Sequence, residues 1–101
     1  MVIRRKVDGA GRVVLPKDLR NWLDIKFWDE LTASIEDGKI IMQKDEQECK
    51  ITEIKRKMDD LGRIVLPRKL LNQLGIAIKD ELAIYVDGGR VIFQKCAPIE
   101  V

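Results

Sequence analysis

With 101 residues, the chain has the usual length of one domain. Two cysteines are too few for a disulfide scaffold or a thiolate metal site, and the lack of histidine excludes histidine-based acid–base catalysis and histidine metal ligation. The formal net charge of +2 is mild, but 36% of the residues are charged and their signs are segregated along the chain, which can create a basic face on a nearly neutral protein.

The same composition bears on location. The sequence has no signal peptide and no apolar run long enough to cross a membrane. We therefore expect a cytoplasmic protein with no membrane partner, in which Cys49 and Cys96 remain free thiols.

The first predicted elements are two short strands joined by a turn. Residues 2–8 are rich in β-branched and basic residues, Gly9-Ala10-Gly11 is a turn signal, and residues 12–15 form the second strand. We expect these strands to pair as a hairpin, with Arg4-Arg5-Lys6 on the first arm and Arg12 directly after the turn.

A short helix is predicted next, over residues 17–23. Pro16 ends the preceding strand, because proline lacks the N–H that a ladder needs yet suits a first helical turn. Leu19 and Leu23 lie four positions apart, so the helix offers one apolar stripe to a core.

A second hairpin follows the helix. Leu31, Ala33 and Ile35 alternate with polar residues, the period-two pattern of a half-buried strand. Asp37-Gly38 is a hairpin turn, and residues 39–44 form the returning strand.

The second half of the sequence repeats the first at an offset of 51 positions. Gly62-Arg63-Ile64-Val65-Leu66-Pro67 matches Gly11-Arg12-Val13-Val14-Leu15-Pro16. Around it come a basic triplet, a helix over 68–74 and strands over 82–86 and 90–95. We predict one domain, residues 1–101, with a first repeat over 1–44, a linker over 45–50, a second repeat over 51–95 and a tail over 96–101.

Each repeat is too small to stand alone, because a unit of about fifty residues buries too little of its surface. We therefore expect both repeats to share one core and to present two similar surfaces related by a pseudo-two-fold axis.

Basic residues gather at equivalent places in the two repeats, on the first predicted strand, after the turn and on the helix. These candidate binding residues are Arg4, Arg5, Lys6, Arg12, Lys17 and Arg20, then Lys55, Arg56, Lys57, Arg63, Arg68 and Lys69. A mixed solvated surface would explain one such triplet, but repetition of the triplet at equivalent positions favours a binding face.

A structural role is also open for the arginines that follow the turns. Arg12 and Arg63 lie near Asp8 and Asp59 in the sequence and could pair with those carboxylates. The two roles are compatible, since an aspartate can orient a guanidinium.

The pattern Asp-x-x-Gly-Arg-(Val/Ile)-Val-Leu-Pro, followed by Leu-x-x-x-Leu, Asp-Glu-Leu and a glycine-centred hairpin, occurs twice. It resembles the AbrB-like (SpoVT-AbrB) DNA-binding domain of prokaryotic transcription regulators. The resemblance implies a mainly β fold with short helices, a swapped-hairpin β-barrel, formed here as an intrachain pseudo-dimer. Residues 57–95 match the family pattern more fully than residues 6–44.

The resemblance also implies sequence- or shape-selective binding of double-stranded DNA in a nucleoid-associated regulator, without a cofactor or metal. It assigns DNA contact to Arg5, Lys6, Arg12 and Arg20, and to Arg56, Lys57 and Arg63. Family members often carry two basic residues in mid-helix, where this chain has Arg20-Asn21 and Leu71-Asn72. The two halves are therefore expected to contact DNA unequally.

Two other classes of function are open to a chain of this size. An enzyme is disfavoured, because the sequence has no histidine and no glycine-rich phosphate loop in the required context. Related barrels serve as antitoxins that also bind DNA, but those usually carry a long toxin-wrapping extension, and only Cys96 to Val101 follows the last strand here. A toxin partner is therefore disfavoured.

Three aromatic residues of the first repeat have no aromatic counterpart in the second. Trp22, Phe27 and Trp28 stand where the second repeat has Gln73, Ile78 and Lys79. Filling of core space is the simplest role for these rings, and we expect it of Phe27. Trp28 replaces a lysine expected to be exposed, which favours a contact with another chain or a partner.

Overall fold

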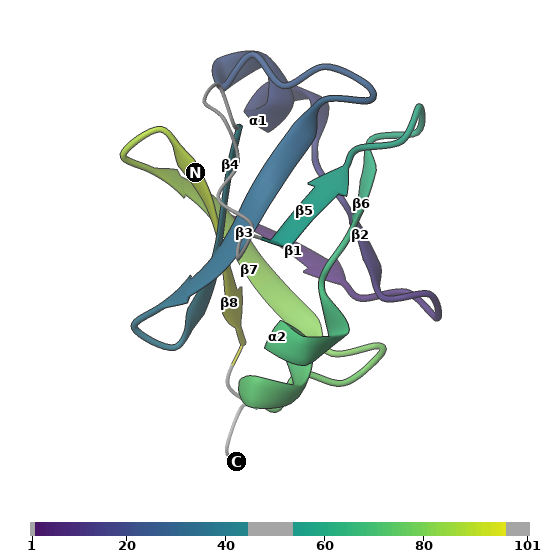
Figure 1. The fold of residues 1–101 in the computed structure, drawn as a ribbon, viewed down its shortest axis with the longest axis vertical. Coiled ribbons are helices and arrows are strands. Elements are labelled where there is room, and N and C mark those ends of the chain that lie inside the picture. The colour runs from purple at the N-terminus through teal and green to yellow at the C-terminus, as the bar shows by residue number, and fades with distance from the viewer. Residues whose placement is uncertain (1, 45–53, 97–101) are drawn as a thin grey trace.

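A computed structural model describes residues 2–44 and 54–96, here called the first half and the second half (Figure 1). The first half contains β1 (Ile3–Lys6), β2 (Arg12–Val14), α1 (Lys17–Trp22), β3 (Glu30–Glu36) and β4 (Lys39–Lys44). The second half contains β5 (Ile54–Lys57), β6 (Arg63–Val65), α2 (Arg68–Gln73), β7 (Glu81–Asp87) and β8 (Arg90–Lys95). The predicted linker over 45–50, with Cys49, and the tail after Cys96 lie outside the described residues.

The strands of the two halves are interleaved. A six-stranded antiparallel sheet has the order β1-β7-β8-β4-β3-β5, so the first strand of each half pairs with the third strand of the other. The central pair of this sheet, β4 and β8, also joins the halves. A second ladder pairs β2 with β6. The fold is mainly β with short helices, as predicted, and its hairpins are exchanged within one chain.

The prediction that residues 2–8 and 12–15 pair with each other as a hairpin is wrong. The turn itself closes, because the N–H of Asp8 donates to the carbonyl of Arg12 over 2.9 Å. Beyond the turn the two arms diverge, since β1 bonds to β7 and β2 bonds to β6. A strand's own sequence shows which face is buried, but not which strand satisfies its backbone groups.

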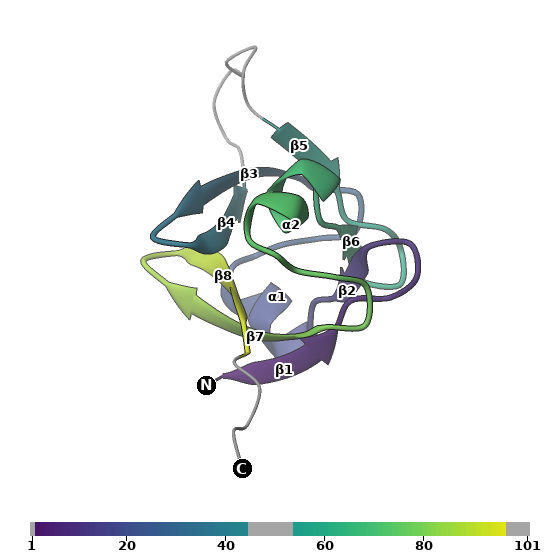
Figure 2. The same ribbon diagram turned by 90° about the horizontal axis from the view of Figure 1, so that it is seen from below.

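The six-stranded sheet curls around the core, and the β2–β6 ladder lies across its open side (Figure 2). Among the described strands, no hydrogen-bonded ladder connects the six-stranded sheet to the β2–β6 pair. The barrel is therefore not closed on either side of this pair. The helices α1 and α2 stand at opposite ends of the molecule (Figure 1). Neither end offers a membrane-crossing segment: no helix in the described ranges is long and apolar enough for that.

Both halves contribute to a single hydrophobic cluster. Leu31, Ile40 and Met42 of the first half are fully buried together with Leu82 and Phe93 of the second, among others. No polar or charged residue of the described ranges is buried. Burial of apolar surface is the main favourable term in folding, and here each half buries its apolar side chains against the other.

The helices begin where the sequence predicted, and each ends one residue earlier, at Trp22 and Gln73, with Leu23 and Leu74 as C-caps. Pro16 and Pro67 precede them, and Leu19 and Leu70 are buried. After the helix comes a residue in the left-handed region, Asp24 with φ of 54° in the first half and Gly75 with φ of 66° in the second. Glycine has no steric penalty there, and aspartate tolerates it better than most residues.

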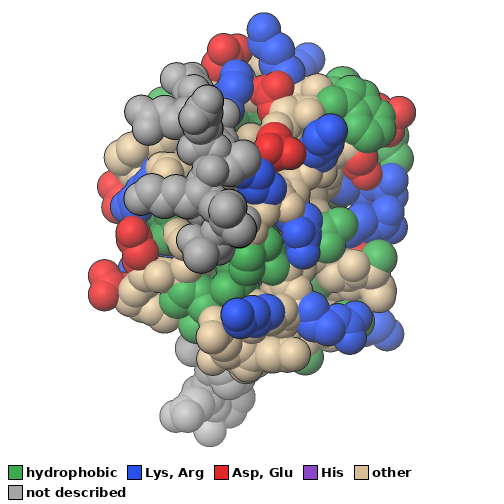
Figure 3. Space-filling model, in the orientation of Figure 1, with side chains coloured by type: hydrophobic (Ala, Val, Ile, Leu, Met, Phe, Trp, Pro, Cys, Tyr) green, Lys and Arg blue, Asp and Glu red, His purple; other side chains and the backbone are tan. Residues whose placement is uncertain are grey.

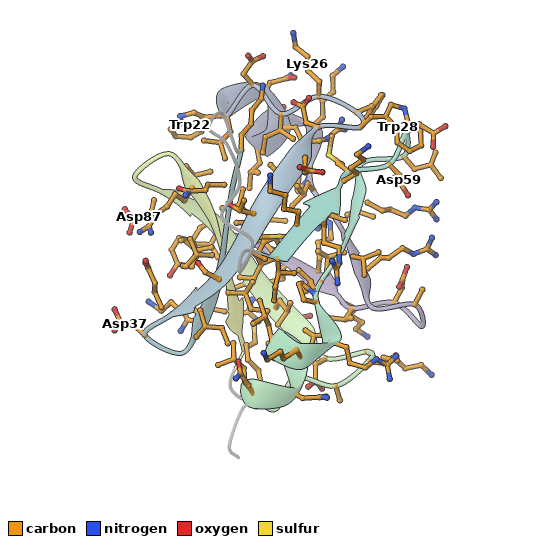
Figure 4. All side chains as sticks on the ribbon, viewed as in Figure 1. Trp22, Lys26, Trp28, Asp37, Asp59 and Asp87 are labelled. Carbon is orange, nitrogen blue, oxygen red and sulfur yellow. The ribbon has the colours of Figure 1, made fainter. Side chains whose placement is uncertain are left out.

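The prediction that Phe27 fills core space is wrong. Its side chain is 48% exposed, and Trp22 and Trp28 are 69% and 62% exposed. Ile25, two positions earlier, occupies the core, and the ring of Phe27 instead lies 5.1 Å below the guanidinium of Arg20. Trp22 and Trp28 project on different sides of the α1 end (Figure 4).

Candidate nucleic-acid interface

The β2–β6 ladder presents two arginines on its outer face. Val13 and Ile64 are opposite each other in the register and both are buried, so the residues on either side of them point outward. Arg12 lies opposite Val65, and Arg63 lies opposite Val14. The two arginines are therefore diagonal neighbours, about 7–8 Å apart at the backbone. The pseudo-two-fold axis passes between Val13 and Ile64.

Each of these arginines is held by an aspartate across the preceding turn. Arg12 donates from Nε to Oδ2 of Asp8 over 2.9 Å, and Arg63 donates from Nε to Oδ2 of Asp59 over 2.7 Å. The other carboxylate oxygen accepts the backbone N–H of the same arginine, over 2.8 Å in both halves. One carboxylate thus fixes both the turn and the side chain that follows it.

The aspartates remain charged at neutral pH. The backbone N–H of Arg12 lowers the pKa of Asp8, with further lowering by the N–H of Ala10 and the Arg12 guanidinium. Burial would raise the pKa of Asp59, but the hydrogen bonds from Arg63 and from the N–H of Leu61 outweigh it and lower the pKa. Because only Nε of each arginine is bonded within the described residues, the two Nη groups can donate to an external acceptor.

The basic triplets lie on the strands that border this ladder. β1 and β5 form the two edges of the six-stranded sheet, and each contacts its neighbour in the small ladder, β2 or β6. Some of their charges are paired with the other half: Arg4 with Glu81 over 3.2 Å and Lys55 with Glu30 over 3.1 Å. Lys6 and Lys57 are exposed.

Charge is unevenly distributed over the surface. In Figure 3, Lys and Arg side chains spread over the face that carries β5 and along the right edge, where some Asp and Glu side chains stand among them, and further Asp and Glu side chains stand at the left edge. Asp37, directly after β3, and Asp87, the last residue of β7, mark that left edge (Figure 4). The turns of the β3–β4 and β7–β8 hairpins are thus acidic and lie far from the β2–β6 ladder.

The candidate DNA-binding residues on the two helices lie at opposite ends of the molecule. Lys17 and Arg20 belong to α1, and Arg68 and Lys69 belong to α2 at the other end of the molecule. Lys17, Arg68 and Lys69 are exposed, but Arg20 is half-buried and donates from Nε to the carbonyl of Leu15 over 3.0 Å. The structure therefore brings Arg12 and Arg63 together and leaves the helical cations at the periphery.

Arg20 also reaches the other half. A Cβ added to Gly62 would lie 3.3 Å from Cζ of Arg20, so the guanidinium packs against the turn between β5 and β6. Its counterpart in the second half, Leu71, is buried. Arg20 thus has a packing role that the sequence did not reveal.

Val14 and Val65 were missed as parts of this surface. They are 43% and 37% exposed and stand beside the two arginines on the outer face of the ladder. Their exposure could have been predicted from the sequence, because successive strand residues point to opposite faces and the neighbouring Val13 and Ile64 point into the core. The outer face thus combines two cations with two small apolar patches.

Other chemistry has little support in the described residues. They contain no group of three or more cysteine, aspartate or glutamate side chains placed to hold a metal ion. Asp29 and Asp80 each accept a backbone N–H over 2.8 Å, from Lys26 and Ala77, and so have structural roles. Cys96 is a free thiol.

Comparison with known proteins gives three kinds of similarity. Residues 55–96 match a family model described as "Antidote-toxin recognition MazE, bacterial antitoxin". The transition state regulatory protein AbrB of Bacillus subtilis (strain 168) is 53% identical over 49 residues, which are 48% of this chain and 51% of that protein. The putative transition state regulator Abh of the same organism is 51% identical over 43 residues, 43% of this chain and 47% of Abh.

Stage V sporulation protein T of the same organism is 47% identical over 51 residues, 50% of this chain and 29% of that protein. The chain spans about half the length of the first two relatives. The solution structure of PHS018 from Pyrococcus horikoshii superimposes with a TM-score of 0.54 and 18% identity, over 93% of this chain and 88% of that one. This last similarity concerns the fold alone.

Proposed function

Because the chain contains an AbrB-like domain, we propose that it binds double-stranded DNA and acts as a prokaryotic transcription regulator rather than as an enzyme. The observation that carries the proposal is the outer face of the β2–β6 ladder, where Arg12 and Arg63 are related by the pseudo-two-fold axis. Each presents free Nη groups, and each is oriented by an aspartate. Duplex DNA has matching two-fold symmetry in its backbone.

The two sets of basic residues would act differently. Arg12 and Arg63 are held in place and would enter a groove, where arginine can pair bidentately with guanine. Lys6 and Lys57, exposed on the bordering strands, would neutralise phosphates and release counterions. With few groups available to read bases, selectivity would rest largely on DNA shape and deformability. Such a partner would associate the protein with the nucleoid in the cytoplasm.

The proposal is tested by selection of bound sequences from random duplex DNA, followed by titration of a selected duplex at several salt concentrations. If the basic residues contact phosphates, the logarithm of affinity will fall by about 0.9 per logarithm of salt for each phosphate neutralised. Affinity that does not change with salt, or no enrichment of any duplex, would contradict DNA binding.

A second candidate function follows from the family match over residues 55–96, whose description names antitoxins. In that case the chain would bind a toxin as well as DNA. Affinity capture with the tagged full chain from cells of its source tests it. Recovery of a stoichiometric small protein that inhibits growth when produced alone would establish the second candidate, and recovery of DNA without such a protein would reject it.

A further inference from the structure

A pocket of about 330 Å³ opens between α2 and the turn that joins β1 to β2. Its apolar lining includes Leu66, Leu71, Ile76 and Ile78, and Arg56 and Arg68 also line it. Nη1 of Arg56 donates to the carbonyl of Lys55 over 2.7 Å. The pocket therefore combines an apolar wall from the second half with two positive charges.

In the first half, the side chain of Arg20 lies across the equivalent place. At the offset of 51 positions, Leu71 corresponds to Arg20 and Ile78 corresponds to Phe27. Arg20 bonds to the carbonyl of Leu15, lies 5.1 Å above the Phe27 ring and packs against Gly62. Leucine and isoleucine are shorter and carry no donor, so they cannot make these contacts and leave the space open.

We propose that this pocket binds a small organic anion with an aromatic or branched apolar body and a single carboxylate, sulfonate or phosphate group. The apolar body takes the place that the end of the Arg20 side chain has in the first half, against Leu71, Ile76 and Ile78. The anionic group pairs with Arg56 and Arg68, whose guanidinium groups suit the geometry of an oxyanion. The volume lies at the small end of the range for ligand pockets, which fits one compact ligand per chain.

Charge complementarity decides between ligand classes. A neutral apolar ligand would bury Arg56 and Arg68 next to a group that cannot accept a hydrogen bond, and a cation would be repelled by both. An anion pairs with the guanidinium groups while its apolar part is removed from water. The pocket adjoins the proposed DNA-binding face, because Val65 of the β2–β6 ladder and Arg56 of β5 line it, but its test with an anionic probe requires no DNA.

The test uses 1-anilinonaphthalene-8-sulfonate as the anionic probe and N-phenyl-1-naphthylamine, the same molecule without its sulfonate, as the neutral comparator. Fluorescence titration of the full chain should give one bound anionic probe per chain and at least about tenfold weaker binding of the neutral one. Amide shifts in two-dimensional NMR should concentrate at Gly11, Leu71 and Ile78.

Two double variants give each half the residues that the other half has at these two positions. Leu71→Arg with Ile78→Phe reproduces the plug of the first half and should abolish probe binding. Arg20→Leu with Phe27→Ile removes that plug and should raise the stoichiometry to two per chain. Circular dichroism confirms folding of each variant, and the second pair remains informative if the first fails to fold. Unchanged probe binding in the folded plugged variant, a stoichiometry of one after removal of the plug, or equal affinity for both probes would overturn the proposal.

Discussion

Arg63 donates from Nε to Oδ2 of Asp59 over 2.7 Å, while Oδ1 of the same aspartate accepts the backbone N–H of Arg63 over 2.8 Å. The first half repeats this arrangement with Arg12 and Asp8. A side chain fixed in this way loses less rotamer freedom when it binds, so more of its interaction energy remains as affinity.

Replacement of these arginines should therefore weaken DNA binding. We expect Arg12→Ala and Arg63→Ala each to cost about 1–3 kcal/mol, measured as a shift in midpoint in an electrophoretic mobility assay. Lys39→Ala is the matched control, because Lys39 lies at the start of β4, beside the acidic turn and remote from the ladder. Wild-type affinity in both arginine variants would remove them from the interface.

Acid should destabilise the fold. The pKa values of Asp8, Asp29, Asp59 and Asp80 lie below the ordinary 3.8, so the folded state binds these protons more weakly than the unfolded state. For Asp29 and Asp80 the main cause is a backbone N–H, from Lys26 and Ala77. The stability that these aspartates contribute is present in full at pH values above their pKa in the unfolded state. It is lost as the pH falls through their lower pKa values in the folded state.

Urea unfolding at pH 7, 5 and 3 measures this loss. The midpoint should change little between pH 7 and 5 and fall at pH 3. The double variant Asp29→Asn, Asp80→Asn should show a smaller fall, whereas Asp37→Asn, at an exposed turn, serves as the control. An equal fall in the double variant and the wild type would show that these carboxylates do not contribute.

Much of the fold could be predicted from local sequence, because Pro16, the glycine turns and the alternation around Ile35 act on neighbouring residues. The partner of each strand could not: interleaving of the two copies was implied only by the family resemblance, and the pairing of β1 with β7 was not predicted. Phe27 was misjudged for a similar reason. Its ring is placed by Arg20, whose own position depends on a carbonyl and on a turn of the other half.

The two turn glycines should differ in their response to alanine. Gly11 and Gly62 have φ of +77° and +79°, so each Gly→Ala change should cost roughly 1–2 kcal/mol from backbone strain. A Cβ at Gly62 also meets Cζ of Arg20 at 3.3 Å, while a Cβ at Gly11 meets nothing closer than 3.9 Å. We expect Gly62→Ala to be the more destabilising in thermal unfolding, and Arg20→Ala to remove the difference. A difference that persists in the Arg20→Ala background would contradict this contact.

The second half alone should not form a stable monomer. In a fragment of residues 51–101, β5 would lack β3 and β7 would lack β1. The fragment should unfold, or associate with a second copy that supplies these strands. Circular dichroism and sedimentation velocity distinguish the cases, and a compact folded monomer would contradict the shared core.

Exposed Trp28 is the best candidate for a contact between chains. Its counterpart Lys79 has the same left-handed backbone, with φ of 75° against 70° for Trp28, so Trp28→Lys is compatible with the local conformation. We expect this variant to sediment as a monomer at concentrations where the wild type associates. Trp22→Gln, which restores the residue of the second half, is the comparison. Identical sedimentation of the wild type and Trp28→Lys would argue against a role in association.

The pairing of β1 with β7 and of β3 with β5 within one chain has a consequence for mass action. When such strands come from two chains, the folded population depends on protein concentration. Here the paired strands belong to one chain, so forming these ladders requires no encounter with a second copy.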